Sequence, residues 1–230
     1  VAQIMEKYDL VAIPVLDSIG CLVGQITVDD VMDEVREQSE RDYQLASGLS
    51  QDVETDDNVF RQTTARLPWL IIGMLGGIGN SMILGNFDAT FAAHPEMALY
   101  IPLIGGTGGN VGTQSSALIV QGLANSSLDS KNTLKQVAKE AVVALINATI
   151  ISLLVYTYNF IRFGAMATVT YSVSISLFAV VMFASIFGTL VPMTLERLKI
   201  DPAIATGPFI AITNDIIGMM LYMGITVLLS

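Results

Sequence analysis

The sequence predicts a mainly α-helical, polytopic membrane protein with five transmembrane helices per protomer and a short N-terminal α/β segment. Hydrophobic residues make up 52% of the 230 residues, only 14% are charged, and the mean hydropathy is +0.60. Soluble domains carry about 25% charged residues. This chain therefore has too many apolar side chains to enclose in a water-soluble core, and a lipid bilayer is its expected surroundings.

Charge is concentrated near the N-terminus. Residues 1–66 hold 14 of the 21 acidic residues and 5 of the 11 basic residues. This acidic balance argues against nucleic acid as a partner, because nucleic-acid binding depends on lysine and arginine contacts to phosphates. Divalent cations are compatible partners. Because the chain begins with Val1 in the middle of a pattern, we expect it to be a fragment of a longer protein.

The first 49 residues predict a small α/β unit. Residues 11–16 and 21–28 alternate like two strands, and residues 17–20 supply turn-forming side chains between them. Asp29 or Asp30 is then expected to cap a helix that runs to about Ala46.

Four carboxylates recur along this expected helix at spacings of three and four, which places them on one face: Asp30, Asp33, Glu37 and Glu40. Like charges at such spacings destabilise a helix when nothing relieves them. A bound divalent cation or a basic partner would relieve the repulsion, and a plain solvated acidic face is the alternative.

Five windows with at most one charge follow, and each can hold one membrane crossing, which needs about 20 apolar residues. They comprise residues 67–87, 97–128, 141–161, 163–195 and 202–230. Residues 50–66 carry a second acidic cluster and are expected to form an acidic connecting helix between the N-terminal unit (1–49) and the transmembrane domain (67–230).

Basic residues predict the orientation. If the N-terminus is cytoplasmic, ten of the 11 lysines and arginines lie on the cytoplasmic side and only Arg162 lies outside, as the positive-inside rule requires. We therefore expect a multi-pass protein of the plasma membrane with its C-terminus outside.

Asp215 lies near residue 216, the midpoint of a last span taken as residues 203–229. An acid at this depth costs about 2.5–3.5 kcal/mol on insertion scales and indicates a functional site. The alternative is a protonated or hydrogen-bonded aspartic acid that only supports packing.

The second window is unusual because five of the eight residues 105–112 are glycine. Glycine disfavours a helix interior by about 1 kcal/mol relative to alanine, so an interrupted backbone facing a wet cavity is one expectation. It would offer free carbonyls and the amides of Asn110 and Gln114 to an ion. Close helix packing through small residues is the equally weighted alternative.

These segments resemble a known family. Residues 102–124, with Gly-Gly-Thr-Gly-Gly-Asn-Val-Gly-Thr-Gln-Ser, resemble the second membrane helix of MgtE-type magnesium channels. Residues 201–203, 207–208 and 214–218 resemble the fifth helix. Residues 13–33 are similar to the end of the second CBS domain of those proteins.

The resemblance implies a homodimer whose ion path is lined by the second and fifth membrane helices of both chains. Asp215 matches the acid at the family's pore ion site, and Ala211 matches a backbone carbonyl ligand. The remaining implied pore-lining residues are Gly108, Gly109, Asn110, Thr113, Thr213 and Asn214. The implied regulatory metal ligands, which would sense intracellular Mg²⁺, are Asp30, Asp33, Glu37 and Asp42.

The resulting hypothesis is a Mg²⁺ uptake channel that closes when intracellular Mg²⁺ is abundant. The resemblance alone selects the ion, since Mn²⁺, Co²⁺ or Ca²⁺ could bind the same oxygens. A secondary transporter coupled to H⁺ or Na⁺ is the first alternative, and a membrane anchor for a working soluble part is the second. We expect no enzyme and assign no catalytic residue, because the membrane spans contain one midplane acid without a paired nucleophile or second acid.

Overall fold

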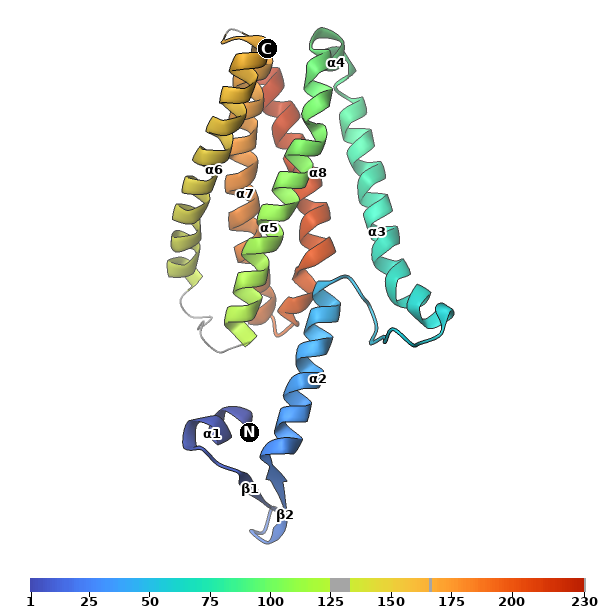
Figure 1. The fold of residues 1–230 in the computed structure, drawn as a ribbon, viewed down its shortest axis with the longest axis vertical. Helices are drawn as coiled ribbons and strands as arrows, with labels where there is room; N and C mark the ends of the chain where they lie inside the picture. Colours follow the sequence, from blue (N-terminus) through green and yellow to red (C-terminus); the bar gives the residue numbers. More distant parts are fainter. Residues whose placement is uncertain (125–132, 166, 230) are drawn as a thin grey trace. The chain divides into compact units, whose positions relative to one another are not determined.

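The computed structural model describes residues 1–124, 133–165 and 167–229, and the chain divides into two units, Val1–Gln44 and Leu45–Ser230 (Figure 1). The described part is mainly α-helical, as predicted. The end of the second predicted window, residues 125–128, lies outside the described residues, as does Lys131, one of the ten basic residues predicted on the cytoplasmic side.

The N-terminal unit contains helix α1 (Ala2–Tyr8) and an antiparallel pair of strands, β1 (Ala12–Leu16) and β2 (Leu22–Thr27). The Asp17 carboxylate accepts the backbone amides of Ile19 at 3.0 Å and Cys21 at 2.8 Å, which closes the turn between the strands. The two predicted strands and their turn are confirmed. That this unit is the end of a CBS domain stays a prediction.

Helix α2 (Val28–Ala46) follows β2 directly. The backbone amide of Thr27 donates to Oδ2 of Asp30 at 3.2 Å, and the Thr27 hydroxyl donates to the same oxygen at 2.5 Å. Asp30 therefore caps the helix from inside its first turn. Asp30 was one of the two predicted caps, but the residue that precedes the helix is Thr27, two or three residues earlier than predicted.

The acidic connecting segment is helical only from Val59, where α3 (Val59–Gly85) begins, so a helix over all of 50–66 is corrected. Its acidic side chains instead stabilise a loop. Asp57 accepts the amide of Glu54 at 2.8 Å and pairs with Arg61 at 2.8 Å. The Asn58 side chain accepts the amide of Arg61 at 2.8 Å and so caps α3.

Leu45–Ser230 contains the long helices, which alternate in direction (Figure 1). Besides α3 they are α5 (Ile101–Ala124), α6 (Thr133–Phe163), α7 (Thr168–Arg197) and α8 (Gly207–Leu229). Short helices connect them: α4 (Asp88–Ala93), η1 (Pro95–Tyr100) and η3 (Pro202–Ala205).

Four of the described helices, namely α3, α6, α7 and α8, are long and apolar enough to cross a membrane. Helix α5 has 24 residues and no charge, but its glycines and polar side chains make it less apolar than the other four. Length and hydropathy therefore support four of the five predicted spans directly.

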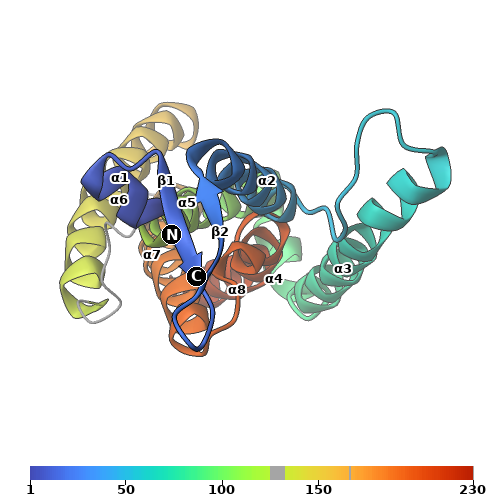
Figure 2. The same ribbon diagram turned by 90° about the horizontal axis from the view of Figure 1, so that it is seen from below.

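Helix α7 is central, since half of its 30 residues are buried. It packs against α5, α6 and α8. Helix α3 lies at the edge of these helices (Figure 2), packs against α8 and buries only Ala65.

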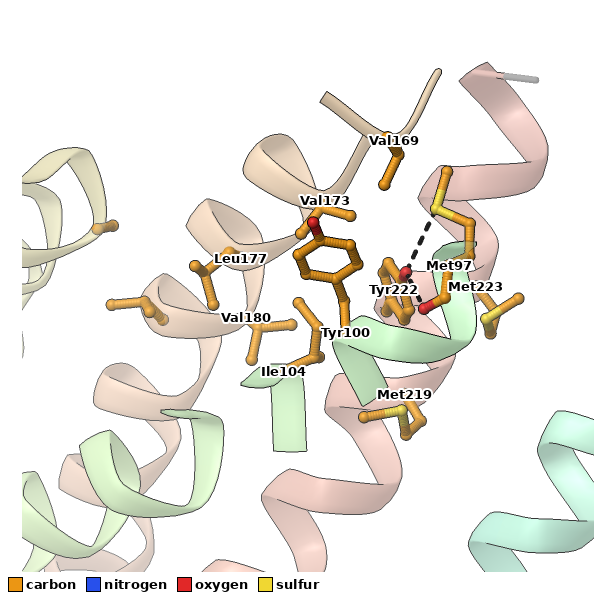
Figure 3. Packing of buried hydrophobic residues seen from close by; sticks show 12 residues of the cluster. Met97, Tyr100, Ile104, Val169, Val173, Leu177, Val180, Met219, Tyr222 and Met223 are labelled. Atoms are coloured by element: carbon orange, nitrogen blue, oxygen red, sulfur yellow. Dashed lines mark hydrogen bonds between the residues drawn. The ribbon is translucent and has the colours of Figure 1, made fainter. Parts of the chain in front are cut away.

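A hydrophobic cluster joins η1 to α5, α7 and α8 (Figure 3). Fully buried Tyr222 donates its hydroxyl to the carbonyl of Met97 at 2.8 Å. Tyr100 donates to Oδ1 of Asn159 in α6. These bonds satisfy the polar ends of two aromatic rings inside apolar surroundings, and they join η1, which leads directly into α5, to α8 and to α6.

Candidate functional site

Asp215 lies in α8, three residues before residue 218, the midpoint of Gly207–Leu229. At 1.5 Å per residue this is about 4.5 Å from the helix centre. The side chain is half-buried. Among the described residues it has no hydrogen-bond or ion-pair partner, so both oxygens of its carboxylate remain available to bind an ion or water.

The carboxylate lies against a glycine surface on α5. A Cβ atom added to Gly105 would lie 3.5 Å from Oδ1 of Asp215, and one added to Gly109 would lie 3.3 Å from it. The same position on Gly109 is 3.7 Å from Cα of Ala211, one turn before Asp215. The two glycines, also one turn apart, thus leave room for the acid and for close approach of α8.

The glycine stretch is a continuous α-helix, so the expectation of an interrupted backbone was wrong. Close packing compensates for the low helix propensity of glycine. A Cβ on Gly108 would lie 2.9 Å from Val180 of α7, and one on Gly112 would overlap the side-chain nitrogen of Asn214. A Cβ on Gly188 of α7 would in turn overlap the carbonyl oxygen of Gly112.

Close packing through small residues, the other expectation, is confirmed for one of two faces of α5. Gly108 and Gly112 serve close helix packing, whereas Gly105 and Gly109 face the acid. The spacing of four residues within each pair was visible in the sequence, but nothing there distinguished the two faces. Gly105, Gly112 and Gly188 were not singled out as site residues from the sequence.

The other predicted pore residues differ in their exposure and in their hydrogen-bond partners. Asn110 is exposed. The hydroxyls of Thr113 and Thr213 each donate to a carbonyl one turn earlier in their own helix, that of Gly109 at 2.8 Å and that of Phe209 at 2.9 Å. Asn214 is fully buried and neither side-chain polar atom has a partner. Asn214 therefore points toward Gly112 rather than toward the glycine face beside Asp215.

The predicted regulatory acids lie along α2, and most are already engaged. Asp30 caps the helix, Asp42 accepts the side-chain amide of Gln38 at 2.7 Å, and Glu37 lies 3.6 Å from Arg41. Asp33 is exposed and has no partner among the described residues.

Arginines on the same helix offset part of the repulsion between the carboxylates of α2. Arg41 also lies 3.3 Å from Glu34, and Arg36 lies 3.3 Å from Glu40. Over residues 1–124, 133–165 and 167–229, no three histidine, cysteine, aspartate or glutamate side chains come together as a metal site. Within the described part of one chain, neither α2 nor the surroundings of Asp215 supplies three such ligands together.

The segment after α2 contacts the start of α8. A Cβ on Gly207 would overlap the carbonyl oxygen of Ala46, and one on Gly48 would lie 2.6 Å from Cγ of Pro208. Gly207 has φ +49°, in the left-handed region that favours glycine. The helix that carries Asp215 therefore begins in tight contact with Ala46, the last residue of α2, and with Gly48 just after it.

Comparisons with known proteins identify one family. Residues 101–225 match the family model MgtE, described as a divalent cation transporter. The magnesium transporter MgtE of Bacillus subtilis is 33% identical over 98% of this chain and 50% of its own length. That of Thermus thermophilus is 33% identical over 100% and 51%, and that of Enterococcus faecalis is 29% identical over 98% and 49%. The chain spans about half the length of these curated relatives.

Proposed function

Since the chain belongs to the MgtE family, whose members are transporters and not enzymes, we propose that it forms the membrane part of a Mg²⁺ uptake channel. In this proposal α3, α5, α6, α7 and α8 each cross the membrane once. Two copies form a homodimer, and α5 and α8 of both copies line the ion path at the dimer axis.

The observation that carries the proposal is the Asp215 carboxylate, half-buried and unpartnered on the glycine face of Gly105 and Gly109. A charged group at membrane depth needs water, an ion or a partner to solvate it. A second Asp215 across a dimer axis, with a cation between the two, would meet this need. Because one chain offers a single carboxylate, the site is complete only in the dimer.

Mg²⁺ suits such a site. It binds six oxygens, loses water reluctantly and is usually held by one or two carboxylates. Two Asp215 carboxylates and the Ala211 carbonyls could hold a hydrated ion weakly enough to release it, as conduction requires. The proposed wider lining comprises Gly109, Asn110, Thr113 and Thr213, with Gly108 and Asn214 behind it. Mn²⁺, Co²⁺ and Ca²⁺ could occupy the same oxygens.

We propose the plasma membrane, with the N-terminus in the cytoplasm and the C-terminus outside. The alternating helix directions put basic residues from α3, α6 and the end of α7 at one end of the helices (Figure 1). Arg162 lies at the other end, in the last turn of α6. A cytoplasmic location of the first end follows from the positive-inside rule.

Gating by intracellular Mg²⁺ is proposed through α2. Its candidate ligands, Asp30, Asp33, Glu37 and Asp42, would need oxygens from another chain or segment to complete a cation site. The contact of Ala46 and Gly48 with the first residues of α8 supplies a mechanical link to the helix of Asp215. Cation binding at α2 would then favour one position of α8.

The test is Mg²⁺ flux into vesicles that contain purified protein with Asp215→Asn, which removes the charge and keeps the shape. We expect flux to be abolished while the protein stays dimeric on size-exclusion chromatography. Glu196→Gln, an exposed acid at the end of α7, is the control and should conduct normally. Undiminished flux through Asp215→Asn would reject the site, and flux that requires an imposed H⁺ or Na⁺ gradient would favour a coupled transporter over a channel.

A further inference from the structure

A second polar site lies on the other side of α5 from Asp215. It is a pocket of about 420 Å³ between α5, α6 and α7. Hydroxyl, carboxamide and charged side chains from all three helices line it. None of its lining residues belongs to the proposed ion path.

Glu140 of α6 forms one wall of the pocket. Its Oε1 accepts the hydroxyl of Ser115 in α5 at 2.7 Å and the hydroxyl of Ser185 in α7. The carboxylate thus joins three helices through one oxygen, and no described residue donates to its Oε2. Lys139, the preceding residue, also lines the pocket, is exposed and forms no ion pair with a described residue.

Four carboxamides complete the polar lining, from Gln114, Gln121, Gln136 and Asn147. None of the four side chains has a hydrogen-bond partner among the described residues. An unpartnered amide facing hydrocarbon costs free energy, because lipid tails cannot form hydrogen bonds. Asn147, within the uncharged residues 141–161 of α6, is such a group, whereas Gln136 lies on the aqueous side of Glu140. The polar lining therefore favours a ligand with hydrogen-bonding groups over lipid tails alone.

The depth of the pocket matches the headgroup layer. The uncharged part of α6, residues 141–161, contains 21 residues, or about 31 Å of helix, which is the thickness of the hydrocarbon core. Lys139 and Glu140 therefore lie where hydrocarbon meets headgroups. The apolar lining residues Val111, Leu118 and Val143 are placed to contact acyl chains.

We propose that this pocket binds the zwitterionic headgroup of an aminophospholipid. The primary ammonium group of the lipid donates to the free oxygen of Glu140, and Lys139 pairs with the phosphate. The carboxamides of Gln114 and Asn147 donate to the ester oxygens below the phosphate. Adjacent side chains of opposite charge favour a zwitterion over a metal cation, which Lys139 would repel.

The proposal is tested by native mass spectrometry of the purified chain titrated with defined lipids. Phosphatidylethanolamine should bind about tenfold more tightly than phosphatidylcholine of the same chain length, a difference of about 1.4 kcal/mol, because a trimethylammonium group has no N–H to donate. Anionic phosphatidylglycerol should bind no better than phosphatidylcholine. Glycerophosphoethanolamine, which lacks acyl chains, should compete only weakly.

Two variants locate the binding in this pocket. Glu140→Gln should weaken phosphatidylethanolamine binding about tenfold, the loss expected for one charge-assisted hydrogen bond, and leave phosphatidylcholine binding unchanged. Lys139→Gln, at an exposed side chain, should weaken both lipids. Glu196→Gln should change neither.

Several results would overturn the proposal. Equal binding of the ethanolamine and choline lipids would remove the role of Glu140, and tightest binding of phosphatidylglycerol would indicate an anion site instead. Competition by glycerophosphoethanolamine as strong as by the lipid would indicate a soluble ligand. If Glu140→Gln does not fold, because a neutral carboxamide oxygen is a weaker acceptor for Ser115 and Ser185, the lipid comparison and Lys139→Gln still decide.

Discussion

Oδ1 of Asp215 in α8 lies so close to Gly109 of α5 that a Cβ atom on this glycine would stand 3.3 Å from it. Glycine at this position lets the two helices approach while the carboxylate remains half-buried and makes no hydrogen bond or ion pair with the part of the chain that the structure describes. The acid and the glycine surface therefore form one structural unit, although 106 residues separate them along the chain.

Gly109→Ala should keep the fold and reduce Mg²⁺ flux. Alanine favours the helix by about 1 kcal/mol, but its methyl group would displace the Asp215 carboxylate by a few tenths of an ångström. We expect flux into vesicles to fall about tenfold, equivalent to about 1.4 kcal/mol. Gly106→Ala is the matched control, since no atom lies within 4 Å of a Cβ there. Equal flux in both variants would show that the carboxylate position does not matter.

Gly188→Ala should destabilise the helices rather than alter the ion site. A Cβ at Gly188 would lie 3.1 Å from Cα of Gly112 and overlap its carbonyl oxygen, and backbone cannot move aside as a side-chain end can. Overpacking of this kind costs about 1–3 kcal/mol. Thermal unfolding in detergent, followed by circular dichroism, should show a lower Tm. Gly224→Ala, which meets no atom within 4 Å, should leave Tm unchanged, and a Tm of Gly188→Ala equal to it would contradict the packing argument.

Asp33→Ala and Asp30→Ala should separate sensing from helix capping in a protein that retains its complete cytoplasmic part. Asp33 has no partner among the described residues, so its loss should leave α2 and maximal flux intact. If Asp33 is a sensor ligand, its loss should weaken channel closure by internal Mg²⁺. Asp30 accepts two hydrogen bonds from Thr27, so its loss should also cost about 1 kcal/mol of helix stability.

Patch recordings at graded internal Mg²⁺ measure closure for both variants, and circular dichroism measures helix content. Glu6→Ala, at an exposed acid in α1, is a control for loss of an acid away from α2. Unchanged closure in Asp33→Ala would show that Asp33 belongs to a solvated acidic face and does not sense Mg²⁺.

Much of the fold was predictable because the signals are local. Windows of sufficient length with at most one charge predicted α3, α6, α7 and α8. The alternation of apolar and polar side chains on either side of a turn predicted β1 and β2. Residues 50–58 were mispredicted because Asp57 and Asn58 bond to backbone and to Arg61, which favours a capped loop over an added helical turn. Local helix periodicity gives no warning of such contacts.

The site was predictable in its chemistry and not in its geometry. A lone acid in an apolar span identified Asp215 without any structure. That Asn214 turns inward while Asp215 faces Gly105 and Gly109 follows from the angle at which α8 packs on α5, which no single helix encodes. The engagement of Asp30 and Glu37 on α2 likewise depends on rotamers of Thr27 and Arg41.

Composition and spacing alone established a helical membrane protein with one acid deep in its last span, because hydrophobicity and charge act residue by residue. Helix packing then assigned the glycines of α5 to two faces, one against Val180 and Asn214 and one against Asp215. It also gathered Ser115, Glu140 and Ser185 into one pocket. Such groupings arise from contacts between segments distant in the chain, whose energies depend on shape complementarity in three dimensions.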